Sequence, residues 1–245
     1  MLWCKMRSQT GLAICDWFVV FSVVAATGGC RMAADGHNLD GVRLYQQGSF
    51  NPAMQRFQKA LAANPDNPDT YYNLARTEHH LASQRNDTEA YDRAEMLYNQ
   101  CLDLDENHVD CHRGLAVLLA ETERSNRAIK LMQNWARANP TSSDPRVELA
   151  RLYDEFGETE TAKMHLNEAL SLNQYDHRAW AALGRIRDEE GEHEQPLADY
   201  HWAIHLNQFQ PAVAERVATL SRSMRADRSI AGPGGTRTVA NPAHY

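Results

Sequence analysis

The chain has 245 residues, of which 43% are hydrophobic and 23% are charged, a balance typical of a soluble globular protein. Its formal net charge of −7 excludes a broad basic surface for nucleic acid and argues against general adhesion to anionic lipid. Alanine, leucine, glutamate, arginine and glutamine are abundant, and β-branched residues are sparse after residue 40. This composition favours helix.

The N-terminal segment has the pattern of an export signal. Lys5 and Arg7 precede an apolar stretch that Asp16 interrupts, so that the longest clean run extends from Trp17 to Ala26. A helix of that length spans about 15 Å, or half of a bilayer core. The apolar part of a signal peptide needs no more, whereas a permanent transmembrane helix does. We therefore expect residues 1–29 to be a signal peptide.

A cysteine follows the apolar run. Gly28, Gly29 and Cys30 resemble the end of the lipobox of bacterial lipoproteins, although Thr27 stands where leucine is usual. The resemblance implies cleavage before Cys30, lipidation of Cys30, and a protein anchored to a membrane of the bacterial cell envelope on the periplasmic side. Because no aspartate follows the cysteine, the resemblance favours the outer membrane. The alternative is ordinary cleavage near Ala26, with Cys30 incidental.

A repeat follows the N-terminal segment. Its clearest feature is a small residue at the start of the second helix of each unit, with spacings of 41, 34, 34 and 34. These residues are Ala53, Ala94, Ala128, Ala162 and Pro196. Four positions later a large apolar residue occurs in each unit: Phe57, Tyr98, Met132, Leu166 and Tyr200. Seven positions later another core position follows: Ala60, Cys101, Trp135, Ala169 and Ala203.

The first helix of each unit carries a second signature, a leucine followed by a small residue. It occurs as Leu74-Ala75, Leu115-Ala116, Leu149-Ala150 and Leu183-Gly184. Glycines mark the turn between the two helices at Gly48, Gly157 and Gly191. Together these features resemble the tetratricopeptide repeat (TPR) family over about residues 34–225. The resemblance implies an all-α fold, a solenoid of helical hairpins that winds as a right-handed superhelix, because one hairpin cannot bury its apolar face alone.

We place five repeats at residues 34–67, 68–108, 109–142, 143–176 and 177–210. The first is degenerate, since Asp40 occupies its leucine position. The second contains a seven-residue insertion around Ser83 to Glu89, which either lengthens its helices or forms a loop. Pro211 begins an amphipathic helix over 211–225 that we expect to cap the array. Residues 226–245 are rich in glycine and proline at their centre and are predicted to be a disordered tail.

The resemblance also predicts where a partner binds. In the TPR family the first helices line a groove that holds an extended peptide or a helix of another protein. The residue after the small position points into this groove, which places Arg76, Arg151 and Arg185 there as candidate ligands for carboxylates. Tyr72 and Asn73 fall on the same side. Acidic residues three and four positions after each of the last two arginines offer an alternative, in which the arginines form ion pairs along their own helix.

The histidines provide a metal-binding alternative. His108 and His112 are four residues apart, as are His201 and His205, and two histidines on one helical face can bind zinc. A third ligand would still be needed, so we favour surface positions and predict no metal. No arrangement of nucleophile and base is apparent, and we predict neither an enzyme nor a cofactor.

Two cysteines, Cys101 and Cys111, lie in the repeat region. They could oxidise only if their Cα atoms came within about 7 Å. Because Cys101 occupies a core position, where a thiol behaves as a small hydrophobe, we expect two free cysteines.

These features predict a non-enzymatic scaffold or assembly factor, exported to the cell envelope, that binds a partner protein in its groove. The architecture is similar to that of the TPR lipoproteins that help outer-membrane pilus secretins to assemble. One alternative is an unanchored repeat module that serves an enzyme or cell-wall assembly complex. The other is a metal-binding protein that uses the histidine pairs.

Overall fold

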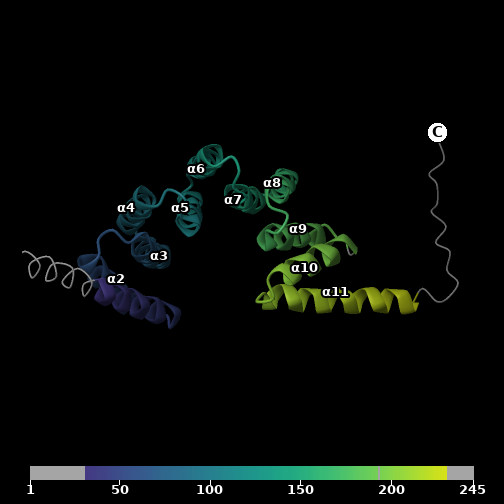
Figure 1. Ribbon diagram of the computed structural model, residues 1–245, viewed down its shortest axis with the longest axis horizontal. Coiled ribbons are helices and arrows are strands. Elements are labelled where there is room, and N and C mark those ends of the chain that lie inside the picture. The colour runs from purple at the N-terminus through teal and green to yellow at the C-terminus, as the bar shows by residue number, and fades with distance from the viewer. Residues whose placement is uncertain (1–30, 193, 231–245) are drawn as a thin grey trace, which may run out of the picture. The chain divides into compact units, whose positions relative to one another are not determined.

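The computed structural model describes residues 31–192 and 194–230, and no strand occurs within them. The chain is helical from 31 to 46 and continues with ten labelled helices (Figure 1). These are α2 (Phe50–Ala63), α3 (Pro68–Arg85), α4 (Thr88–Leu104), α5 (Val109–Glu121), α6 (Ser125–Ala138), α7 (Asp144–Glu155), α8 (Thr159–Leu172), α9 (His177–Glu189), α10 (Glu194–Leu206) and α11 (Pro211–Ile230). The all-α prediction is confirmed. The predicted signal peptide, Cys30 and residues 231–245 of the predicted tail lie outside the described residues.

The chain divides into two compact units, and the boundary falls within α6, between Ala128 and Ile129. In the first unit α2 packs on α3, α3 on α4, and α4 on α5. In the second unit α7 packs on α8, α8 on α9, α9 on α10, and α10 on α11. Within each unit, these consecutive helices are therefore neighbours in space. No helix within the described ranges is both long and apolar enough to cross a bilayer.

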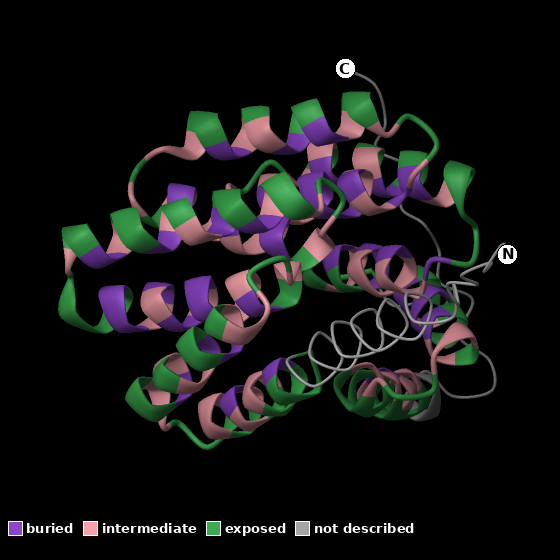
Figure 2. Ribbon diagram, turned by 60° about the vertical axis from the view of Figure 1, so that its left-hand side comes forward, coloured by how far each residue is buried: buried purple, intermediate pink, exposed green. Residues whose placement is uncertain are grey.

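The repeat positions form the core. In the second helix of each repeat, the small residue, the large apolar residue four positions later and the core residue seven positions later are all buried. They run from Ala53, Phe57 and Ala60 in the first repeat to Pro196, Tyr200 and Ala203 in the last. Figure 2 shows the consequence as a buried stripe along one side of most helices, with exposed residues on the other side. The register predicted from the 34-residue spacing is confirmed because the positions that it aligns are the positions that lose contact with water.

The turns between the helices of each hairpin require a left-handed backbone. Gly48, Gly157 and Gly191 have φ values of +74°, +75° and +83°, which glycine adopts without steric cost. Asn86 and Glu123 adopt positive φ in the other two hairpins. The predicted role of the three glycines is confirmed, and two further turns use the same geometry without glycine.

The insertion in the second repeat lengthens its helices. α3 has 18 residues and α4 has 17, whereas α5 has 13 and α8 has 14. α3 ends at Arg85, and Asp87 then caps α4 by accepting a hydrogen bond from the backbone N–H of Ala90 at 3.1 Å. Of the two alternatives for this segment, the longer helices are present.

The last helix packs as a cap, as expected, but extends further. Leu220 is buried on α11, and Val213 and Val217 are partly buried. α11 continues to Ile230, so residues 226–230, which we predicted to be part of the disordered tail, are helical. The sequence Ala-Asp-Arg-Ser-Ile contains neither glycine nor proline, and nothing therefore ends the helix before Ile230.

The expectation of two free cysteines is wrong. Cys101, in the last turn of α4, and Cys111, in the first turn of α5, form a disulfide with their Cα atoms 6.7 Å apart. α4 ends at Leu104 and α5 begins at Val109. The short connection brings two buried positions together from a sequence separation of ten residues.

Close approach of helices depends on residues without a large side chain. A Cβ atom at Gly114 on α5 would lie 2.6 Å from the ring of Tyr98 on α4, and one at Gly184 on α9 would lie 3.0 Å from the ring of Tyr200 on α10. A Cβ atom at Gly41 would likewise meet the ring of Phe57. Each of these glycines therefore accommodates an aromatic ring of the helix beside it.

We expect Gly114→Ala to destabilise the protein by about 1–3 kcal/mol, because the added methyl group overpacks a core position and Tyr98 is only 1% exposed. Gly36→Ala is the matched control, since a Cβ at Gly36 meets no described residue within 4 Å. Gly36 lies within a helix, so the control should be stabilised by up to about 1 kcal/mol. Urea unfolding of both variants tests this contrast, and equal effects would contradict it.

Candidate functional site

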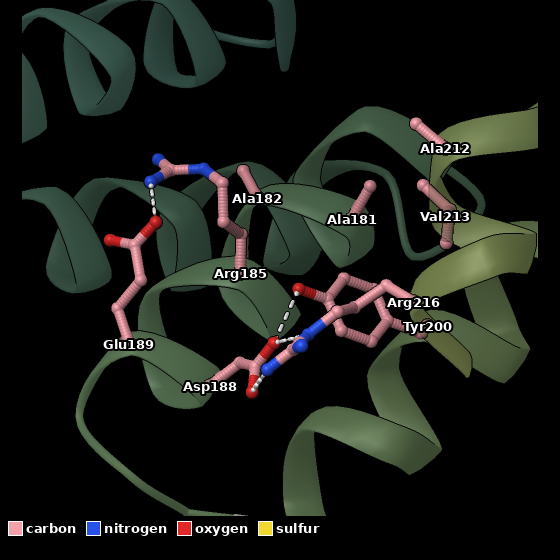
Figure 3. Close-up of a pocket in the computed structure, with 9 residues that line it drawn as sticks. All are labelled: Ala181, Ala182, Arg185, Asp188, Glu189, Tyr200, Ala212, Val213 and Arg216. Carbon is pink, nitrogen blue, oxygen red and sulfur yellow. Dashed lines mark hydrogen bonds and ion pairs between the residues drawn. The ribbon is translucent and has the colours of Figure 1, made fainter. Parts of the chain in front are cut away.

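The second unit has a hollow of about 540 Å³ between α9 and α11 (Figure 3). Small apolar side chains form part of its wall and charged side chains surround them. The residues that line it are Ala181, Ala182, Arg185, Asp188, Glu189, Tyr200, Ala212, Val213 and Arg216.

The hollow exists because the residues that face it from α9 and α11 are small. Ala181 and Ala182 on α9, with Ala212 and Val213 on α11, leave space that larger residues would fill. α10 packs against both of these helices and contributes the ring of Tyr200. A concave, largely apolar space with a few polar groups at its edge is typical of a binding site.

Asp188 organises one side of the hollow. Its carboxylate accepts two hydrogen bonds from the guanidinium of Arg216, one of them 2.6 Å long, so that an ion pair joins α9 to α11. The hydroxyl of Tyr200 lies 3.5 Å from the same carboxylate. Burial, together with the charge of Asp188, raises the pKa of Tyr200 to about 12. The hydroxyl is therefore protonated at neutral pH and acts as a donor.

Arg185, a predicted groove residue, lies on α9 like Asp188 and borders the hollow beside Glu189, at the left of Figure 3. It forms an ion pair of 2.8 Å with Glu189 on its own helix and a second one with Asp154 on α7. Burial lowers the pKa of Arg185, but the hydrogen bonds to these two carboxylates outweigh it and raise the pKa overall. The intrahelical pair expected for Arg185 is present, and Arg185 also borders the hollow. Its role as a ligand for a partner stays a prediction.

Arg151 on α7 is paired more deeply. Its Nε lies 3.2 Å from Glu148, whose side chain is 1% exposed, and its Nη1 contacts Glu155. Its Nη2 is buried without a hydrogen-bond partner among the residues described by the structure. Arg151 therefore offsets the charge of a buried carboxylate, and the intrahelical alternative describes it.

Arg76 on α3 has different surroundings. Its guanidinium lies 3.8 Å from the ring centroid of Tyr45 and 5.9 Å from that of Tyr72. No ion pair joins Arg76 to a carboxylate within the described part of the chain. Aromatic faces attract a cation but do not neutralise it, so Arg76 keeps its positive charge.

The other two predicted residues lie beside Arg76. Tyr72 is partly buried, with its ring centroid 5.4 Å from that of His108. Asn73 donates a hydrogen bond of 3.2 Å to the side chain of Asn38. The structure therefore brings Tyr72, Asn73 and Arg76 together in the first unit, and Arg151 and Arg185 lie in the second.

The histidine pairs do not converge on one point. His108 caps α5 by accepting a hydrogen bond from the backbone N–H of Cys111, whereas His112 contacts the carbonyl of Glu106 at 3.0 Å. His201 and His205 lie beside the exposed ring of Trp202 on α10. A different set is compact: ligand atoms of Cys101, His108 and Cys111 all lie within 4.8 Å of one another.

The sequence did not predict that Asp188, Tyr200 and Arg216 line one hollow. Tyr200 was identified only as a core residue, and Asp188 only as one of the acidic residues after Arg185. Arg216 lies on the capping helix, to which we assigned no binding role. The small residues that face each other from α9 and α11, at Ala181 and Ala212, were the available signal.

We expect Arg151→Ala to cost about 2 kcal/mol, because it removes the guanidinium that pairs with the buried Glu148 carboxylate. Partial exposure of Arg151 and its unsatisfied Nη2 keep the cost below that of a fully buried pair. Arg185→Ala, which breaks more exposed pairs, should cost less than about 1 kcal/mol. Chemical unfolding at pH 7 measures both, and a larger loss for Arg185→Ala would reverse the assignment.

Comparison with known proteins gives the same architecture. Residues 41–78 match a model of the TPR repeat, and residues 144–176 match a model of the tetratricopeptide repeat. No curated protein matches the chain. A thermophilic TPR protein of Thermus thermophilus superposes with a TM-score of 0.58 at 23% identity, covering 77% of this chain and 98% of that one.

PilF of Pseudomonas aeruginosa superposes with a TM-score of 0.52 at 16% identity, covering 84% of this chain and 95% of its own. At these identities the likeness concerns the fold alone. The two matched segments lie in different units of the chain, and the buried register extends the same pattern through the hairpins around them. The chain therefore contains tetratricopeptide repeats and has the helical-hairpin fold of TPR proteins.

Proposed function

We propose that the protein is a non-enzymatic scaffold that binds a partner protein at the hollow between α9 and α11. TPR-type repeats generally mediate protein–protein interaction, which is the coarse basis of the proposal. The specific binding site is supported by the hollow, an open space with alanine side chains in its wall and both signs of charge at its edge.

The shape and chemistry of the hollow select one kind of ligand. A volume of about 540 Å³ accommodates one or two apolar side chains of a peptide or helix, and burial of such anchors supplies most of the affinity of an interface. The carboxylate of Glu189 and the guanidinium of Arg185 stand side by side at the edge. Polar groups that flank the apolar anchor of the partner can exchange hydrogen bonds with both.

Arg76 supplies a second contact in the first unit. Its charge is not offset by a carboxylate of the described residues, and the ring of Tyr45 holds its guanidinium in place. A preorganised guanidinium binds a carboxylate with two parallel hydrogen bonds. We therefore propose that Arg76 contacts an acidic residue of the partner, whereas Arg151 serves stability.

We also propose that the protein is exported to the bacterial cell envelope and anchored by lipid at Cys30. The apolar run before Gly28-Gly29-Cys30 supports this. The Cys101–Cys111 disulfide adds support, because structural disulfides persist mainly in oxidising compartments such as the periplasm. The alternative, an exported module without an anchor, shares the disulfide and differs only at Cys30.

We expect Ala182→Trp to reduce capture of the partner at least tenfold, because the indole would fill the space that the anchor of the partner needs. The measurement is quantitative crosslinked pull-down from native membranes, with the amount of each captured protein compared between variants. Ala218→Trp, at an exposed position of α11 outside the hollow, is the matched control and should leave capture unchanged. Equal capture by both variants, each with unchanged thermal stability, would contradict the proposed site.

We expect metabolic labelling with a fatty acid to modify the wild-type chain and not Cys30→Ala. The variant should also move from the membrane fraction to the soluble periplasmic fraction. An unlabelled wild-type chain would disprove the anchor and favour the unanchored alternative, without bearing on the binding site.

A further inference from the structure

Outside the proposed binding site, the junction of α4 and α5 holds three groups with the chemistry of a metal site. Cys101 ends α4, His108 caps α5, and Cys111 lies in the first turn of α5. Their ligand atoms lie within 4.8 Å of one another. We propose that, when the disulfide is reduced, these three residues bind a zinc ion, so that the disulfide and the metal are alternative crosslinks of one helix junction.

The spacing of the ligands suits zinc. In a tetrahedral site with Zn–S distances of about 2.3 Å and Zn–N distances of about 2.0 Å, ligand atoms are about 3.5–4 Å apart. Once the S–S bond is broken, the two sulfurs must move apart to reach that spacing, while the ligand atom of His108 already lies within 4.8 Å of both. Cys101 and Cys111 are fully buried, whereas His108 is partly exposed. The fourth position is therefore open to water on the side of His108, as in zinc sites with three protein ligands.

His108 is already oriented as a ligand. Its Nε2 lies 3.1 Å from the carboxylate of Asp69, and its Nδ1 accepts a hydrogen bond from the backbone N–H of Cys111. A histidine that binds zinc through one nitrogen commonly donates the other N–H to a carboxylate, which fixes the tautomer and the ring. Here Asp69 holds the proton on Nε2, so Nδ1 presents its lone pair towards Cys111.

Reduction of the disulfide precedes metal binding. A dithiol transfers two electrons and two protons to the Cys101–Cys111 disulfide, becomes a disulfide itself, and leaves two thiols. Zinc then displaces one proton from each thiol, so that two protons are released for each ion bound. Neutral His108 gives up its hydrogen bond to the N–H of Cys111 and changes no charge. Reoxidation reverses the sequence and expels the ion, because a disulfide sulfur is a poor zinc ligand compared with a thiolate.

The test uses the full chain with Cys4, Cys15 and Cys30 replaced by serine, so that only the two cysteines of the junction remain. The protein is reduced with a trialkylphosphine, which becomes its oxide by taking oxygen from water and does not compete as a thiol. Cobalt(II) serves as the spectroscopic probe and zinc as the competitor. We expect one cobalt ion for each reduced chain, with a thiolate-to-metal charge-transfer band that zinc abolishes, and no binding to the oxidised chain.

His108→Asn separates ligation from folding. Asparagine is a good N-cap, so α5 keeps its first hydrogen bond while the imidazole is lost. We expect zinc affinity to fall at least tenfold in His108→Asn, to fall about tenfold in Asp69→Asn through loss of the orienting carboxylate, and to stay unchanged in His205→Asn. Absence of binding to the reduced chain, equal binding to the oxidised chain, or unchanged affinity in His108→Asn would each overturn the proposal.

Discussion

In three of the hairpins, a small residue of the first helix packs where a large residue of the second helix needs space. Gly41 accommodates Phe57, and Gly184 accommodates Tyr200. Ala150 lies in one buried cluster with Leu166, so alanine meets an aliphatic partner where glycine meets an aromatic one. Because interiors are packed as densely as crystals, one methyl group on the wrong side would separate the helices. This packing constraint sets the distance between the two helices of a hairpin. It therefore also sets which way their other side chains point.

The hollow between α9 and α11 follows from the same packing. Tyr200 is held against Gly184, which places its hydroxyl beside Asp188 and allows Arg216 to join α9 to α11. A capping helix is needed to cover the last hairpin, and α11 packs on α10 but faces α9 across the hollow with small residues. The cap thereby closes the fold and leaves a recess of the kind that holds an anchor residue of a partner.

The arginines illustrate how charge is assigned in this fold. Arg76, Arg151 and Arg185 were all candidates to bind a carboxylate of a partner, yet each has different surroundings. Arg151 neutralises a buried carboxylate, Arg185 bridges two acidic residues beside the hollow, and Arg76 rests on tyrosine rings. Removing one member of an ion pair with a buried partner destabilises a protein, whereas a stacked cation keeps its charge. The surroundings of each guanidinium, and not its position in the repeat, therefore decide what it can bind.

The sequence by itself determined the all-α class, the hairpin register and the positions of three turns, because these depend on local spacing. Small and large residues recur at intervals of 41 and then 34 positions, and glycines permit positive φ. Only the tertiary structure decided what depends on distances across helices. It joined Cys101 to Cys111, brought His108 beside both, and formed the hollow from Ala181 and Arg216 on different helices. A periodic pattern states which face of a helix is buried, but it does not state how far that face lies from the next one.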